Sequence, residues 1–257
     1  MQTPWIIVSQ GAEGWLGFFF QAAAGLLLFF LEYTGKFNIP YSKFRRGGGL
    51  NPRVAMLLIY ASPIPVYLFY YWLYGPLSLY HVVLFYAFVF HFGKRCMESL
   101  FLHRYSKPMS WTPVLIVGFA YMNVGGLAGA VHGKILAPAG ENISHSILFA
   151  VGLVVFATGE VLNFYHHILL SRLRKPGDIS YAVPSGGLFN LVASPHYLAE
   201  LIAWTGYAMM SRFLAMYGIL FIFICYLTAR AVRTSAWYRE NVPGYPTDRK
   251  AILPFLL

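Results

Sequence analysis

The chain has 257 residues, of which 58% are hydrophobic and only 11% are charged. Soluble domains carry about 25% charged residues, so the composition excludes an ordinary soluble domain and indicates that much of the chain lies in lipid. A formal net charge of +10 would suit a nucleic-acid-binding protein. The positions of the charges favour a membrane topology signal instead, and we expect no nucleic-acid partner.

Apolar runs follow one another along the chain, each near the roughly 20 residues that a helix needs to cross a bilayer. Pro63 and Pro65 should bend the second run. The run that begins at Tyr197 is too long for one span, and we divide it near Ser211 and Arg212. Seven spans result, at Glu13–Leu31, Val54–Trp72, Leu79–Leu102, Thr112–Val131, Ser146–Leu170 and in two halves of Tyr197–Thr228. The predicted fold class is an all-α membrane protein with seven transmembrane helices.

Basic residues between these spans predict the orientation. With seven spans, 17 of the 19 Lys and Arg residues fall on one side of the membrane, and only Lys134 and Arg212 fall on the other. Because loops on the cytosolic side carry an excess of Lys and Arg, the N-terminus is predicted outside or in a lumen and the C-terminus in the cytosol. The same basic face offers a place for a phosphorylated cytosolic molecule.

Ionisable side chains at membrane depth are costly, and many of them are functional. Helical spacing groups these residues on three faces, although ion pairs that join helices would explain each pair equally well. The three faces are His91, Arg95 and Glu98; Glu160, Asn163 and His167; and His196 with Glu200. Three such faces in a small bundle predict a shared polar cavity. No HExxH motif or repeated histidine box is present, so we predict no metal site, and neither a GxGxxG nor a Walker loop occurs.

The segment from Arg172 to Tyr207 combines a basic cluster, two Gly-rich turns and a helix start at Ser194 and Pro195. Gly-rich turns let backbone N–H groups approach an anion, and a helix N-terminus adds partial positive charge. The segment therefore predicts a phosphate-binding region of moderate strength.

This segment resembles the steroid 5α-reductases, through LRKPGDISY, PSGGLF and the following SPHYLAE and WTGY stretches. The tail from Arg230 to Leu257 resembles the same family, so the likeness covers roughly residues 160–257. Upstream, Lys94–Ser106 is also similar to very-long-chain trans-2-enoyl-CoA reductases. The resemblance implies seven spans and NADPH bound by the C-terminal half, with helices 1–3 (residues 1–110) on the side of the lipid substrate and residues 111–257 as the cofactor region. Carried over by position, the cofactor residues are Lys36, Arg95, Asn163, His167, Arg174, His196, Arg230 and Tyr238.

The chain departs from the family where those enzymes use a Glu and a Tyr on the substrate's 3-keto oxygen. By alignment these positions hold Ile59 and Phe92. Hydride delivery to an enone needs a donor for the developing oxyanion, so another group must provide it. We favour Tyr197, beside His196 and three residues before Glu200, over Tyr60. The predicted catalytic residues are Tyr197, Tyr60 and Glu200.

The leading hypothesis is an NADPH-dependent, multi-pass membrane reductase of the C=C bond of an α,β-unsaturated carbonyl, either a 3-oxo-Δ4-steroid or an enoyl lipid. It would lie in the endoplasmic reticulum if eukaryotic and in the inner membrane if bacterial. One alternative is an isoprenylcysteine-type methyltransferase, which would use S-adenosylmethionine. The other is a lipid- or sterol-binding homologue that lost its catalytic acids. The oligomeric state stays open.

Overall fold

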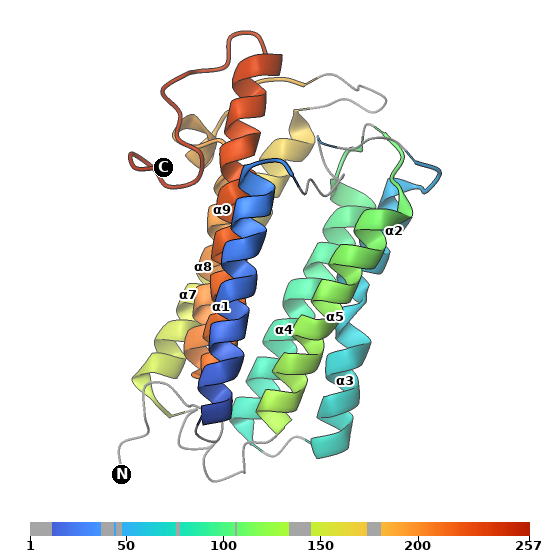
Figure 1. The fold of residues 1–257 in the computed structure, drawn as a ribbon, viewed down its shortest axis with the longest axis vertical. Helices are drawn as coiled ribbons and strands as arrows, with labels where there is room; N and C mark the ends of the chain where they lie inside the picture. The colour runs from blue at the N-terminus through green and yellow to red at the C-terminus, as the bar shows by residue number, and fades with distance from the viewer. Residues whose placement is uncertain are drawn as a thin grey trace.

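A computed structural model describes residues 12–36, 44, 48–75, 78–105, 107–133, 145–173 and 181–257. These residues form a bundle of long helices and no strand, with only two isolated bridges (Figure 1), which confirms the all-α prediction. The α-helices are α1 (Ala12–Tyr33), α2 (Pro52–Ala61), α3 (Pro63–Tyr74), α4 (Leu79–Met97), α5 (Trp111–Gly133), α7 (Ile147–Arg172), α8 (Pro195–Ser211) and α9 (Leu214–Asn241). A π-helix, η2 (Glu98–Leu102), extends α4, and a 3-10 turn, η3 (Gly187–Asn190), precedes α8.

Five helices of the described residues are long and apolar enough to cross a membrane. They are Gly14–Tyr33, Pro52–Tyr74, Trp111–Gly133, Ile147–Arg172 and Leu214–Asn241. The other two predicted spans correspond to α4 and α8, which run lengthwise in the same bundle (Figure 1). The predicted division near Ser211 is confirmed as a helix break, because α8 ends there and Arg212 adopts a left-handed conformation with φ 62°. The predicted bend also appears as a break, at Ser62 between α2 and α3.

Glycines set the spacing of α7 and α8. A Cβ atom on Gly159 would lie 2.2 Å from the backbone nitrogen of Ala203, and one on Gly206 would lie 2.2 Å from that of Phe156. Small residues let membrane helices approach closely. In lipid the hydrophobic effect does not drive helices together, so van der Waals packing and hydrogen bonds between them do so instead. This close packing fixes the half of the site that lies on α7 relative to the half on α8.

We predict that Gly159→Ala lowers the free energy of unfolding by about 1–3 kcal/mol, because the new methyl group meets backbone atoms that cannot move without shifting a helix. Gly17→Ala is the matched control, since nothing lies within 4 Å of a Cβ atom at Gly17. Denaturant titration of both variants in detergent micelles measures the effect. Equal stability of the two variants would contradict the packing described here.

A buried polar network ties the helices together at one end of the bundle. His132 of α5 lies 2.6 Å from the Tyr67 hydroxyl of α3 through Nδ1 and 2.9 Å from Ser211 Oγ of α8 through Nε2. Tyr80 of α4 donates to the Ser211 carbonyl oxygen at 2.7 Å. Buried polar groups that find partners in this way rigidify the helix ends they join.

The C-terminal tail holds the segment that leads into α8. The backbone N–H groups of Ala193 and Ser194 donate to the carbonyl oxygens of Lys250 and Ala251, at 2.8 and 3.1 Å. The buried guanidinium of Arg249 donates to the Pro184 carbonyl oxygen at 2.6 Å. The tail thereby fixes the start of α8, which carries His196 and Glu200.

Candidate functional site

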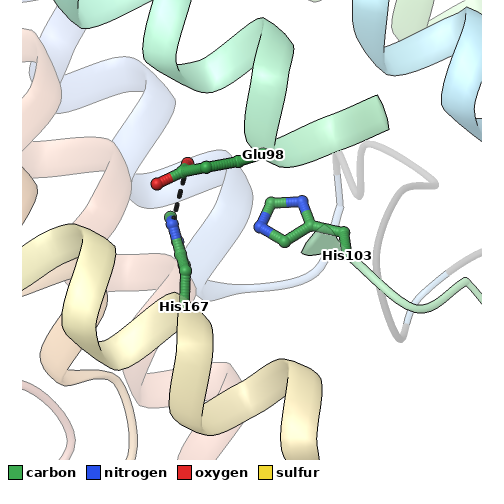
Figure 2. Close-up of side chains that lie close together, drawn as sticks. All are labelled: Glu98, His103 and His167. Atoms are coloured by element: carbon green, nitrogen blue, oxygen red, sulfur yellow. Dashed lines mark hydrogen bonds and ion pairs between the residues drawn. The ribbon is translucent and has the colours of Figure 1, made fainter. Parts of the chain in front are cut away.

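Glu98, His103 and His167 point toward one another where α4 passes into η2 (Figure 2). Glu98 Oε2 lies 3.0 Å from His167 Nδ1, and the rings of His103 and His167 stand nearly perpendicular with centroids 4.9 Å apart. π-helical segments occur often at functional sites because they re-aim the side chains that follow a regular helix. Here Glu98 begins such a segment, and its carboxylate is buried.

The guanidinium of Arg95 already contacts two members of this trio. Arg95 Nη1 bonds to Glu98 Oε2 and lies 2.7 Å from His167 Nδ1. A divalent metal ion would have to share these donors with a permanent positive charge at close range, which strongly disfavours it. Burial, together with the positive charge of Arg95, lowers the pKa of His103 to about 4, so its ring is neutral at pH 7. We therefore treat the trio as the support of Arg95.

The Arg95 side chain contacts residues of three other elements, η2, α7 and α2, and we call this group of contacts the Arg95 hub. Besides Glu98 and His167, it reaches α2, where Nη2 donates to the Tyr60 hydroxyl at 2.6 Å. Its guanidinium also lies over the Tyr60 ring, 4.6 Å from the centroid. Because arginine has no acceptor, the Tyr60 oxygen accepts this bond.

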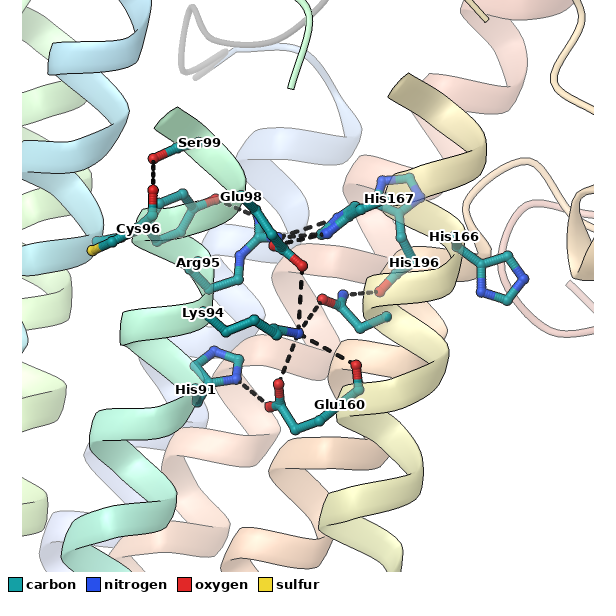
Figure 3. Close-up of polar contacts among 12 residues, drawn as sticks. His91, Lys94, Arg95, Cys96, Glu98, Ser99, Glu160, His166, His167 and His196 are labelled. Carbon is teal, nitrogen blue, oxygen red and sulfur yellow. Dashed lines mark hydrogen bonds and ion pairs between the residues drawn. The ribbon is translucent and has the colours of Figure 1, made fainter. Parts of the chain in front are cut away.

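Lys94 of α4 connects the polar residues of α4 with those of α7 (Figure 3). Its ammonium lies 2.7 Å from Glu160 Oε2 and 2.8 Å from Asn163 Oδ1, while His91 Nδ1 lies 2.5 Å from Glu160 Oε1. Asn163 in turn donates to the His196 carbonyl oxygen of α8 at 2.9 Å. The predicted polar faces of the third and fifth spans therefore meet, and the third face joins them through His196.

An aromatic wall adjoins the hub. The Tyr60 ring stacks with Tyr121 of α5 at 6.0 Å, and Phe92 of α4 lies edge-on to Tyr121 at 5.3 Å and to Trp204 of α8 at 6.0 Å. Ile59 and Phe92, which the sequence comparison predicts at the positions of a Glu and a Tyr in the steroid 5α-reductases, are both buried, and neither side chain can donate a hydrogen bond. Tyr60 is the predicted donor that the structure joins directly to the Arg95 hub.

The other two predicted catalytic residues lie on α8. Glu200 is buried and adds negative charge around Arg95. The Tyr197 ring contacts the His196 ring at 4.3 Å and packs beside Ala231 and Ile252, on the side of α8 that faces α9 and the tail. The structure thus places Tyr60 and Tyr197 in different surroundings.

The remaining predicted cofactor residues do not join the Arg95 hub in the contacts described. Arg230 donates to Glu32 of α1 at 2.8 Å, and its guanidinium lies over the Phe44 ring at 4.4 Å. The ammonium of Lys36 lies 5.5 Å from the Phe30 centroid. Tyr238 stacks with Tyr245 at 5.0 Å. Arg174 lies outside the residues that the structure describes.

Sequence reasoning missed two members of the site. Lys94 is one of the 17 basic residues on the predicted cytosolic side, and its four-residue spacing from Glu98 is the signal that could have placed it on the polar face. Tyr121 is one of 19 tyrosines, and no local pattern distinguishes it. Its role follows only from the packing of α5 against α2 and α4.

Comparison with known proteins supports the resemblance. The sequence pattern of the 3-oxo-5-alpha-steroid 4-dehydrogenase family matches residues 107–257, more than half of the chain. The chain belongs to this family. It is 34% identical to 3-oxo-5-alpha-steroid 4-dehydrogenase 1 of Homo sapiens over 171 residues, which cover 66% of the chain and 65% of the relative. It is 32% identical to 3-oxo-5-alpha-steroid 4-dehydrogenase 2 of Homo sapiens over 185 residues, covering 70% and 72%. The match to the first relative therefore spans a little under two thirds of that protein.

Proposed function

We propose that this chain is a membrane reductase that transfers hydride from NADPH to the β-carbon of an α,β-unsaturated carbonyl in a lipid, foremost a 3-oxo-Δ4-steroid. Family membership supports the reaction class, which is an oxidoreductase acting on a CH–CH group. The observation that carries the proposal is the 2.6 Å bond from Arg95 to the buried Tyr60 hydroxyl beside an aromatic wall. A donor there suits the carbonyl end of an apolar substrate.

Residues at the start of α8 fit the polar groups of a dinucleotide. Ser194 Oγ, at the N-cap of α8, is fully buried and has no hydrogen-bond partner within the described part of the chain. Pro195 has no N–H and the Tyr197 N–H bonds to the Ser194 carbonyl oxygen at 3.1 Å, so the attraction for an anion at the start of α8 comes chiefly from the helix dipole. When bound, NADPH supplies the hydride. We propose that it is held by Asn163, His167, Arg174, His196, Arg230 and Tyr238, with Lys36 and Arg95 nearby.

Tyr60 would act on the substrate's carbonyl oxygen. Hydride addition at the β-carbon moves negative charge onto that oxygen, and a positioned O–H donor stabilises it as it develops. Arg95 holds Tyr60 and lies close enough for its charge to favour the same change, while Glu98 and His167 hold Arg95 in place. The aromatic wall keeps water from this oxygen. Tyr197, with Glu200 on the same helix, is the alternative donor.

The proposed topology places α4 and α8 in the membrane as well, which completes seven spans. The N-terminus would then lie outside or in a lumen and the C-terminus in the cytosol, where NADPH is available. Residues 1–110 would form the lipid-substrate side and residues 111–257 the cofactor region. The host membrane would be the endoplasmic reticulum in a eukaryote or the inner membrane in a bacterium.

An enoyl lipid is the second candidate substrate class. Glu98 and His103 belong to the stretch that is similar to very-long-chain trans-2-enoyl-CoA reductases, and both lie beside the hub. Membership of the steroid dehydrogenase family favours reduction over methyl transfer. By the predicted alignment, Ile59 and Phe92 replace the Glu and the Tyr that the family uses on the 3-keto oxygen. A lipid-binding homologue without catalysis is therefore the alternative that activity assays must exclude.

Cofactor choice gives a direct prediction. NADPH at 100 times its dissociation constant should stabilise the purified protein by about 2.7 kcal/mol, visible as a rise in Tm. NADH and S-adenosylmethionine at the same concentration should produce a much smaller shift. Thermal unfolding in detergent measures all three, and a shift with S-adenosylmethionine alone would overturn the reductase proposal.

A further inference from the structure

A groove opens between α4 and α7, on the outer surface of the bundle. It has a volume of about 700 Å³, with walls of apolar side chains from both helices. Tyr86 and Phe90 of α4 stand in its wall and are 62% and 58% exposed, so this face meets lipid if the helices span the membrane. Ala87 and Ala157 are the smallest side chains in its lining. Pockets of about 300–1,000 Å³ hold ligands of drug-like size, so this space is large enough for a compact ring system.

The groove has one polar end, formed by Lys94 and Glu160. The Lys94 ammonium donates to Asn163 Oδ1 at 2.8 Å and to the Glu160 carbonyl oxygen at 3.4 Å, and it forms an ion pair with Glu160 Oε2 at 2.7 Å without a hydrogen bond to that atom. The Glu160 carboxylate receives one contact on each oxygen, from His91 and from Lys94, and each carboxylate oxygen can accept two. The Glu160 carboxylate therefore has spare acceptor capacity at this end of the groove, and its Oε2 atom is buried without a hydrogen-bond partner among the described residues.

We propose that this groove is a binding site for a sterol-type alcohol, with its hydroxyl group donating to Glu160 and its fused rings between α4 and α7. A hydroxyl group brings the donor that the carboxylate can still accept, whereas a ketone brings only an acceptor. A rigid ring system also loses less conformational freedom on binding than a flexible chain. The site is separate from Tyr60, and it does not depend on the proposed reduction or on NADPH.

The test uses the full chain in lipid nanodiscs without NADPH, with radiolabelled cholesterol as the probe. Saturable binding is expected, and cholest-4-en-3-one, which differs mainly by a ketone in place of the hydroxyl, should compete at least about tenfold more weakly. Hexadecan-1-ol should compete weakly as well. Equal competition by the ketone would overturn the role of Glu160, and equal competition by hexadecan-1-ol would overturn the ring assignment.

Two matched variants test the location. Ala157→Phe should fill the groove and weaken cholesterol binding by about tenfold or more. Ala150→Phe places the same side chain at an exposed alanine of α7 that does not line the groove, and it should change binding less than about twofold. Thermal unfolding checks that both variants fold, and Ala157→Leu replaces Ala157→Phe if that variant does not. If a folded Ala157→Phe or Ala157→Leu variant binds cholesterol as tightly as the parent protein does, the proposed site is wrong.

Discussion

Replacing Arg95 by methionine should lower kcat/KM for NADPH-dependent reduction by about a thousandfold or more and should also destabilise the protein by about 3–5 kcal/mol. The catalytic loss follows because Tyr60 loses the group that bonds its oxygen at 2.6 Å. The loss of stability follows because Glu98 would remain as a buried carboxylate without the cation that bonds it. Enone-dependent oxidation of NADPH measures the first effect, and denaturant titration in detergent measures the second.

A double variant separates the two roles of Arg95. Arg95→Met combined with Glu98→Gln removes the buried charge that lost its hydrogen-bonded cation and kept only Lys94, at 3.7 Å, so most of the lost stability should return. Activity should not return, because the Tyr60 oxygen still lacks its donor. A double variant that regains parental kcat would show that Arg95 acts only through folding. Arg95→Lys keeps the positive charge without the forked geometry of the guanidinium. Its kcat/KM should therefore lie between that of the parent protein and that of Arg95→Met.

Tyr60→Phe should lower kcat by about 10²–10³ while the Kd for NADPH stays within about twofold. The hydroxyl is the part of Tyr60 that would contact the developing oxyanion, and its ring, which stacks on Tyr121, is unchanged in phenylalanine. Single-turnover kinetics with a steroid enone, together with cofactor titration, measure the two quantities.

Two further substitutions of the same kind serve as comparisons. Tyr121→Phe, on the ring stacked against Tyr60, should lower kcat by less than about tenfold. Tyr197→Phe should also have the smaller effect, because its ring packs toward α9 and the tail. If instead Tyr197→Phe removes turnover and Tyr60→Phe keeps it, the donor is Tyr197, as the sequence alone favoured.

Much of the fold follows from apolar runs and breakers in the sequence. Pro63 marks the break between α2 and α3, and the polar pair Ser211 and Arg212 marks the break between α8 and α9. Spacing by three, four and seven residues also predicted which polar side chains share a helix face. Two of these faces then meet through Lys94, because α4 and α7 bring oppositely charged faces together.

Other parts of the site depend on tertiary packing. Nothing local indicates that Arg230 pairs with Glu32, nearly 200 residues earlier, because this contact requires α1 to lie against α9. The π-helical turn that aims Glu98 at Arg95 has no signal in the local sequence. The contact between Tyr60 and Arg95 likewise follows only once α2 and α4 are placed side by side.

The most direct test of the account follows deuterium from the cofactor. NADPH that carries deuterium at the transferable C4 position should be incubated with the protein and a 3-oxo-Δ4-steroid, and the product examined by mass spectrometry and NMR. We expect one deuterium per product molecule, bound at the former β-carbon of the enone. A reduced product with no deuterium at that carbon, or no product under conditions in which NADPH binds, would contradict it.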